Sequence, residues 1–436
     1  MSSLVAIVGR PNVGKSTLFN RLTETRDAIV DPTSGVTRDR KFGRAIWSGK
    51  EFAIIDTGGY AIHSDDSFEE VIRKQVIISI DEADLILFLV DVQTGITDLD
   101  QEVADIIRRV GKKTILVSNK VDTSDKEYES SVFYSLGVGD QVFSISANNG
   151  YGTGDLLDEI IRVLPVELEK DEEEGIPKLA VIGQPNVGKS SFINTLLGEE
   201  RNIVTNIAGT TRDALHTRYQ AFGFDFMLID TAGLRKKAKI DDAIEFYSTV
   251  RTIRAVAESD VCLIMIDASN DFNKQDIQIF FDALEQNKGV VLLVNKWDLI
   301  EKDTKTADAW TKMIKERIAP FNDVPILYTS NLTKQRILKA VEVALEVYEN
   351  RRRKIPTSQL NDVMQDIISA FPPPALKGKL IRIKYMTQLP TRFPAFAFYC
   401  NHPQYIKEPY KRFLENKLRE NFNLTGAPVR IYVREK

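Results

Sequence analysis

The octapeptide Gly9–Ser16, Gly-Arg-Pro-Asn-Val-Gly-Lys-Ser, constrains the fold of this chain more than any other stretch. It matches the phosphate-loop pattern G-x-x-x-x-G-K-[ST] at every fixed position. Apolar residues 4–8 predict a strand before it, and residues 17–22 predict a helix after it. The loop would therefore lie at a helix N-terminus, where free N–H groups and the helix dipole attract an anion. Lys15 could then reach the outer phosphates of a nucleotide, and the Ser16 hydroxyl could ligate Mg²⁺.

The same pattern recurs 174 residues later as Gly183–Ser190, Gly-Gln-Pro-Asn-Val-Gly-Lys-Ser. Asp-Thr-Gly-Gly at 56–59 returns as Asp-Thr-Ala-Gly at 230–233, with the same spacing. Asn-Lys-Val-Asp at 119–122 returns as Asn-Lys-Trp-Asp at 295–298, with a spacing of 176. Because the register hardly drifts over the length of a domain, the sequence predicts a duplicated nucleotide-binding domain.

Within each copy, apolar strand patterns alternate with helical ones, which is typical of an α/β fold with a mostly parallel sheet and helices on both faces. Residues 85–90 and 114–118 are continuous apolar runs, as expected of strands buried on both faces. The polar motifs follow strand ends, which is where open α/β sheets bind ligands.

The last segment has a different pattern. Residues 360–370 predict a helix, 381–385 and 395–399 two strands, 410–422 an amphipathic helix, and 429–433 a third strand. This order predicts a small α/β domain.

These patterns predict four parts. They are a first nucleotide-binding domain at 1–164, an acidic linker at 165–177, a second nucleotide-binding domain at 178–349 and a basic α/β domain at 350–436.

With 436 residues, 43% hydrophobic and 28% charged, the chain has the composition of an ordinary globular protein. Two cysteines and no Cys/His cluster give no sign of zinc or a disulfide framework. The chain starts directly with a strand, and no apolar run approaches membrane-spanning length. We expect a cytoplasmic monomer without a membrane partner.

The net charge of −4 hides an asymmetry. From residue 351 onwards there are 17 Lys and Arg but only 6 Asp and Glu. A basic block on an acidic body indicates a polyanionic partner such as nucleic acid, and the alternative is a solvated surface with no partner.

The Asn-Lys-x-Asp motifs select the base. Guanine presents N1–H and an exocyclic amino group on one edge, and an ionised carboxylate accepts from both. Asp122 and Asp298 stand where they could do so, whereas adenine would leave the carboxylate unpaired. Asn119 and Asn295 would contact the base or brace the phosphate loop.

Asp56 and Asp230 stand where a carboxylate holds Mg²⁺, and the backbone of Gly59 and Gly233 could meet a γ-phosphate. Thr37 and Thr211, again 174 residues apart, are the candidate switch threonines in loops that γ-phosphate and Mg²⁺ could order.

Tandem guanine-nucleotide domains, a short acidic linker and a basic C-terminal α/β domain resemble the EngA (Der) family of bacterial-type GTPases over essentially the whole chain. The resemblance implies two consecutive P-loop GTPase domains followed by a KH-like domain. It also implies a role in maturation of the large ribosomal subunit, with ribosomal RNA as partner.

The resemblance bears on catalysis as well. Ras-like enzymes place a water-orienting Gln where this chain has Tyr60 and Leu234, so another group must take that role. In GTPases that share Pro-Asn-Val-Gly-Lys-Ser, the Asn helps to bind K⁺, which implies that role for Asn12 and Asn186. The alternative is that each Asn only stabilises the turn.

Three features depart from the family pattern or lack a counterpart. KH domains usually clamp RNA with a G-x-x-G loop, but the tail's glycines are Gly378 and Gly426. The tail could therefore contact the RNA backbone through its basic face, or pack between the GTPase domains. If Ser330 matches Ser146, the base-edge loop differs, with Asn331 following Ser330 and Lys334 near the position of Gly150. A basic cluster follows the second Asp-x-x-Gly and comprises Arg235, Lys236, Lys237 and Lys239. It could contact RNA, contact the other domain, or have no role.

The residues predicted to bind nucleotide in the first domain are Gly9, Arg10, Pro11, Asn12, Val13, Gly14, Lys15, Ser16, Thr17, Asp56, Thr57, Gly58, Gly59, Tyr60, Asn119, Lys120, Val121, Asp122, Ser146 and Ala147. Those in the second domain are Gly183, Gln184, Pro185, Asn186, Val187, Gly188, Lys189, Ser190, Ser191, Asp230, Thr231, Ala232, Gly233, Leu234, Asn295, Lys296, Trp297, Asp298 and Ser330. The predicted catalytic residues are Lys15, Lys189, Thr37 and Thr211, and the predicted Mg²⁺ ligands are Ser16, Thr37, Asp56, Ser190, Thr211 and Asp230.

We therefore expect a GTPase that uses Mg²⁺ and K⁺ and whose nucleotide state controls its attachment to the large ribosomal subunit. The alternatives are a nucleic-acid-binding module with structural nucleotide sites, or a tRNA-modification or translation GTPase. A tRNA-modification or translation GTPase would need an added domain, for which the chain has no room. A kinase or ATPase is disfavoured by the duplicated Asn-Lys-x-Asp.

Overall fold

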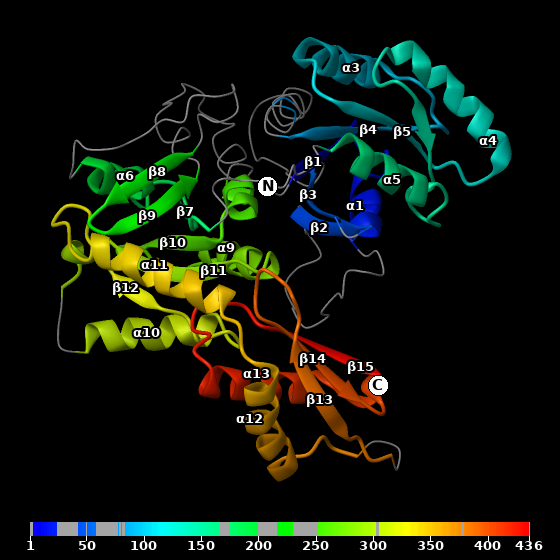
Figure 1. Ribbon diagram of the computed structural model, residues 1–436. Coiled ribbons are helices and arrows are strands. Elements are labelled where there is room, and N and C mark those ends of the chain that lie inside the picture. Colours follow the sequence, from blue (N-terminus) through cyan, green and yellow to red (C-terminus); the bar gives the residue numbers. More distant parts are fainter. Residues whose placement is uncertain are drawn as a thin grey trace. The chain divides into compact units, whose positions relative to one another are not determined.

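A computed structural model describes residues 3–23, 42–48, 50–57, 77, 80, 83–164, 175–198, 216–229, 252–301, 305–375 and 379–435 (Figure 1). Contacts divide the chain into two compact units. Unit 1 comprises residues 1–172 and 238–257, and unit 2 comprises residues 173–237 and 258–436.

Unit 1 contains a six-stranded sheet in the order β2-β3-β1-β4-β5-β6. Only β2 runs antiparallel, paired with β3, and the other neighbouring strands are parallel. Its elements are β1 Ser3–Val8, α1 Lys15–Thr23, β2 Phe42–Trp47, β3 Lys50–Asp56, β4 Leu85–Asp91, α3 Asp98–Val110, β5 Thr114–Asn119, α4 Ser124–Glu129, the 3₁₀ helix η2 Ser130–Leu136, β6 Val142–Ser144 and α5 Thr153–Val163.

Alternate residues of the central strands supply two separate cores. Val5, Ile7 and Leu87 pack under α1 and α5, while Ala6 and Phe88 pack under α3 and η2. Figure 1 shows α3 on one side of the sheet and α1 and α5 on the other. Burial on both faces explains why these strands are continuous apolar runs in the sequence.

Unit 2 repeats this plan in a sheet ordered β12-β11-β10-β7-β9-β8, with β8 antiparallel to β9. Its elements are β7 Lys178–Gly183, α6 Lys189–Gly198, β8 Thr217–Ala221, β9 Phe224–Ile229, β10 Val261–Asp267, α9 Lys274–Glu285, β11 Gly289–Asn295, the 3₁₀ helix η4 Trp297–Leu299, α10 Thr306–Arg317, β12 Ile326–Tyr328 and α11 Ile337–Arg352. Helices α6 and α11 share a core on one face of this sheet.

The same unit holds a three-stranded sheet ordered β13-β14-β15. Its elements are α12 Thr357–Ala370, β13 Ile383–Gln388, β14 Ala395–Cys400, the 3₁₀ helix η5 Pro403–Tyr405, α13 Glu408–Asn421 and β15 Arg430–Glu435. Helices α12 and α13 cover one face through Leu360, Met364, Leu414 and Leu418. The predicted order of helix, strand, strand, helix and strand is confirmed, although β13 begins at Ile383 rather than Ile381.

Hydrogen bonds tie this small sheet to the second large one. The Val290 N–H at the start of β11 donates to the carbonyl of Gly426 at 2.8 Å, and the Gly426 N–H donates to the carbonyl of Asp323 at 2.9 Å. The Arg419 guanidinium lies 4.4 Å from the Phe321 ring centroid and pairs with Asp323 at 3.2 Å. The described helices include none that is long and apolar enough to cross a membrane.

Candidate nucleotide sites

The two phosphate loops have the same backbone geometry. Asn12 and Asn186 both adopt the left-handed conformation with φ of 64°. A Cβ on Gly14 would lie 2.4 Å from the Asn119 side-chain nitrogen, and one on Gly188 would lie 2.4 Å from that of Asn295. Glycine is therefore required where the loop passes under the base motif.

Each loop lysine points back onto its own loop. Lys15 Nζ donates to the carbonyls of Gly9 at 2.9 Å and Arg10 at 2.8 Å, and Lys189 Nζ does the same to Gly183 at 2.8 Å and Gln184 at 2.6 Å. Burial lowers the pKa of Lys15 to about 8, with Arg10 adding to the effect and Asp56 opposing it. Burial likewise lowers the pKa of Lys189 to about 8. Burial disfavours the charged form of both ammonium groups, and an anionic phosphate would stabilise that form again.

The first site brings two predicted Mg²⁺ ligands together. The Ser16 hydroxyl donates to Asp56 Oδ2 at 2.5 Å, and Asp56 is buried at the end of β3. A hydroxyl and a carboxylate oxygen are the hard donors that Mg²⁺ prefers, so the residues present fit that ion. The Thr57 hydroxyl donates to the carbonyl of Ile7 and has a structural role.

Asn119 links the phosphate loop to the base-edge loop. Its side-chain N–H donates to the Val13 carbonyl at 2.8 Å, and its oxygen accepts from the Ala147 N–H at 2.9 Å. The Ser146 hydroxyl donates to Asp122 Oδ1 at 2.7 Å and so orients the carboxylate predicted to bind guanine. Asn119 therefore braces the loop, which was one of its two predicted roles.

The second base-edge loop has different hydrogen bonds. Asn295 still donates to Val187 at 2.9 Å, but the Ser330 hydroxyl accepts from the Thr333 N–H at 3.1 Å. Asn331, where the first domain has Ala147, donates to the Gly188 carbonyl at 2.9 Å. The sequence difference at this loop thus adds a direct tie to the phosphate loop.

Sequence reasoning missed one acidic residue in each site. Lys120 of the base motif pairs with Asp91 at 2.6 Å, and Lys296 pairs with Asp267 at 2.6 Å. Burial alone would raise the pKa of Asp267, but hydrogen bonds from Lys296 and Ser269 hold it below its ordinary value. Both aspartates end the central strand of a sheet, and their spacing of 176 could have revealed them.

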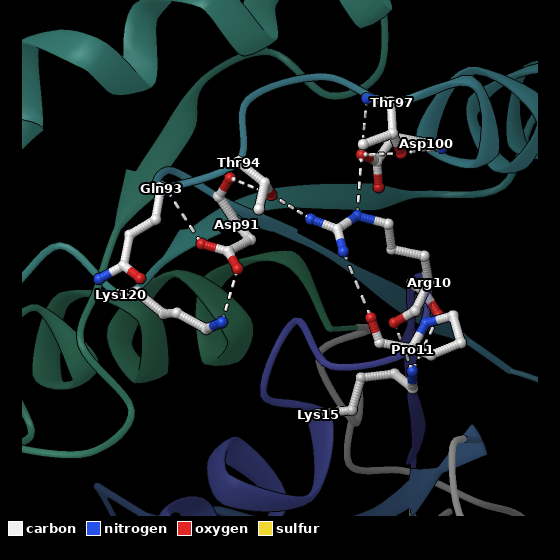
Figure 2. A network of polar contacts seen from close by, with 10 residues as sticks. Arg10, Pro11, Lys15, Asp91, Gln93, Thr94, Thr97, Asp100 and Lys120 are labelled. Atoms are coloured by element: carbon white, nitrogen blue, oxygen red, sulfur yellow. Dashed lines mark hydrogen bonds and ion pairs between the residues drawn. The ribbon is translucent and has the colours of Figure 1, made fainter.

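A second missed network surrounds Arg10 (Figure 2). Its Nε donates to Asp100 Oδ2 at 3.2 Å, and its terminal nitrogens donate to the Pro11 carbonyl at 3.4 Å and to the Thr94 hydroxyl. Asp100 belongs to the capping box at the start of α3, together with Thr97. This contact joins the first phosphate loop to a helix 90 residues away in the sequence.

Thr17 and Ser191 are exposed at the beginning of α1 and α6, directly after the loop serines. The predicted site residues that lie outside the described part of the chain are Thr37, Gly58, Gly59, Tyr60, Thr211, Asp230, Thr231, Ala232, Gly233 and Leu234. The basic cluster at 235–239 also lies outside it.

Comparison with known proteins matches three stretches of the chain to family models. Residues 4–120 and 178–296 each match the family described as 50S ribosome-binding GTPase. Residues 354–434 match the KH-domain-like C-terminal domain of EngA bacterial GTPase enzymes.

Full-length relatives are similar to the whole chain. GTPase Der of Bacteroides fragilis is 56% identical over 438 residues, and GTPase Der of Christiangramia forsetii is 55% identical over 436 residues. Each match covers 100% of both chains. Among solved structures, the G domain of the T. maritima FeoB iron transporter is 28% identical, with 37% of this chain and 99% of that chain covered and a TM-score of 0.28.

Proposed function

This chain belongs to the EngA (Der) family of GTPases, and from that premise we propose that its two nucleotide sites control binding to the large ribosomal subunit during its maturation. The protein hydrolyses GTP to GDP and phosphate, as its family does. The observation that supports the proposal best is the duplicated site itself, with Asp122 held by Ser146 beside a braced phosphate loop.

In this proposal the residues of each site divide the work. Asp122 and Asp298 select guanine, while Lys15 and Lys189 leave the loop carbonyls and meet the outer phosphates. Ser16 and Asp56, with Thr37, hold Mg²⁺ in the first site, and Ser190, Asp230 and Thr211 do so in the second. Bound Mg²⁺ neutralises charge that develops on the phosphates during transfer.

We also propose K⁺ near Asn12 and Asn186, because both side chains project from a left-handed position inside the loop. The ion would supply positive charge where other GTPases use an arginine finger.

The proposed partner is the ribosomal RNA of the large subunit. Support comes from the surplus of Lys and Arg after residue 350 and from the family match named for 50S binding. We place the domain boundaries at 1–164, 165–177, 178–349 and 350–436, and we propose a cytoplasmic monomer. The relatives match along their entire length, which supports a Der-like role over a translation or tRNA-modification GTPase.

One experiment tests both the base assignment and the control of binding. In the double variant Asp122→Asn/Asp298→Asn, the new amides can donate to xanthine, so phosphate release should switch from GTP to XTP by about tenfold or more. Co-sedimentation with large-subunit particles should then depend on a non-hydrolysable XTP analogue instead of the GTP analogue.

Asp140→Asn, which changes an exposed aspartate, is the matched control and should keep the preference for GTP. An unchanged preference in the double variant would refute the base assignment. If co-sedimentation does not depend on the nucleotide, the proposal that nucleotide state controls ribosome binding is refuted. Equal turnover in KCl and NaCl would contradict the K⁺ assignment.

A further inference from the structure

The two phosphate loops differ in the side-chain contacts that connect them to the helix following the central strand. Arg10 and Gln184 occupy the same position in the two loops, directly after the first glycine. Each side chain reaches the N-terminus of the helix that follows the central strand, α3 in the first domain and α9 in the second. The backbone of the loops is alike, so at the first glycine the difference lies in these two side chains. At the other end of the second loop, Asn331 adds a hydrogen bond to the Gly188 carbonyl.

Arg10 connects the first loop to its surroundings through a charged side chain. Its guanidinium joins Asp100, Thr94 and the Pro11 carbonyl, so one side chain bonds the helix, the loop after β4 and its own loop (Figure 2). Asp100 is fully buried, and its Oδ2 also accepts from the Thr97 N–H at 3.0 Å and hydroxyl at 2.8 Å. A guanidinium and a buried carboxylate form hydrogen bonds that are roughly twice as strong as neutral ones.

Gln184 makes a neutral contact instead. Its amide donates to Asn273 Oδ1 at 2.9 Å, and that oxygen also accepts from the backbone at the start of α9. Asp276, the counterpart of Asp100, is 3% exposed, and no cation in the part of the chain that the structure describes pairs with it as Arg10 pairs with Asp100. In both carboxylates the other oxygen, Oδ1, has no hydrogen-bond partner among the described residues, so the difference between the two sites is confined to Oδ2.

We propose that Arg10 is a positioning residue that locks the first phosphate loop onto α3, and that Gln184 leaves the second loop looser, so the second site releases nucleotide faster. This inference rests on the proposed assignment of both loops as guanine-nucleotide sites. The loop amides bind phosphate only in one arrangement, and holding them there in advance slows dissociation.

Exchanging the two side chains tests the inference. The background Asp298→Asn confines a fluorescent methylanthraniloyl-GDP to the first site, and Asp122→Asn confines it to the second. Adding Arg10→Gln should speed release from the first site by about tenfold. Adding Gln184→Arg should slow release from the second by about fivefold, because the new guanidinium can pair with Asp276.

Arg10→Gln leaves the buried Asp100 without its cation and could lower stability. The pair Arg10→Gln/Asp100→Asn removes that charge, so it should restore the melting temperature while release stays fast. Arg10→Lys should slow release only partly compared with Arg10→Gln, since an ammonium keeps the charge but not the planar set of donors of a guanidinium. Arg162→Gln and Gln278→Arg, at exposed positions, are the matched controls.

A pH profile separates positioning from general stability. Burial raises the pKa of Asp276, with Asp267 adding to the effect and hydrogen bonds from Gln184 and the Asn273 backbone opposing it. Asp267 is itself paired with Lys296, so its charge is partly neutralised. Because the pKa of Asp276 is raised, release from the second site should quicken as the pH falls and Asp276 gains a proton at a higher pH than an ordinary aspartate, and Gln184→Arg should flatten this profile.

Release rates within twofold of the background in both exchanged variants would overturn the inference. If either background variant still bound the fluorescent GDP at both sites, the base assignment would fall instead. Release of the fluorescent GDP would then be measured as two kinetic phases from the chain without either Asp variant, with and without Arg10→Gln. A change in one phase would still test the role of Arg10.

Discussion

At the scale of single residues, two lysines carry the charge of the phosphate loops, Lys15 buried and Lys189 half-buried. Lys15 and Lys189 both have a pKa of about 8 because burial disfavours the ammonium form. Between about pH 8 and the ordinary value of 10.5, the unfolded chain binds more protons at these lysines than the folded chain does. Each lysine therefore lowers stability below pH 8, and this cost disappears as the pH rises towards 10.5.

A bound phosphate should reverse this effect by raising both pKa values. We therefore expect GDP binding at pH 8 to take up roughly half a proton per site. Calorimetry in two buffers with different ionisation enthalpies measures the uptake directly. Lys15→Met should remove the contribution of the first site, and binding without any proton uptake would contradict the lowered pKa values.

Motif residues could be predicted from the sequence because their spacing along the chain is fixed by the loop or turn that contains them. Lys15, Asn119 and Asp122 are of this kind. The contact between Arg10 and Asp100 could not be predicted, because it depends on how two strands place their following loops side by side. Residues 90 positions apart then come within reach of one long side chain.

The buried strands were the most predictable elements. A strand covered on both faces, such as β4, is apolar along its buried run, here residues 85–90, and this leaves a clear signal in one sequence. The start of β13 was less predictable, because its pairing with β14 is irregular between Ile383 and Tyr385. An alternating pattern does not show where such an irregularity shifts the register.

A glycine sets the close approach of α1 to β2. A Cβ on Gly43 would lie 2.7 Å from Phe19 Cζ and 2.3 Å from Thr23 Cγ2. Gly43→Val should therefore push the helix away and cost about 1–3 kcal/mol of stability. Thermal unfolding should show a lower first transition, with the GDP-bound form affected too because α1 begins at Lys15.

Gly154→Ala is the matched control in the same domain. It lies in α5 with open space around its Cβ position, so it should leave the transition unchanged or raise it. A Gly43→Val protein that unfolds at the original temperature would show that the helix can shift without loss.

At the scale of the whole molecule, the nucleotide state of the second domain must reach the basic C-terminal domain if it is to control RNA binding. The structure offers a short path, because β11 begins at the Gly426 anchor and ends at Asn295 in the base motif. Asn350 of α11 adds a hydrogen bond to the Thr425 carbonyl at 3.1 Å. A rigid connection of this kind can transmit a displacement from one end of the strand to the other.

Gly426 is the residue on which this connection depends. Its φ of +75° is left-handed, and a Cβ there would lie 2.5 Å from Val347 Cγ2 and 3.0 Å from the Val290 carbonyl. Gly426→Val should therefore separate the two sheets of unit 2. Hydrogen exchange should then speed up at the Val290 amide and across β13 to β15, while Gly198→Ala, a helical position with open space, should change neither. If the C-terminal strands of Gly426→Val kept their protection, the two sheets would be coupled through other contacts, and the path through β11 would lose its support.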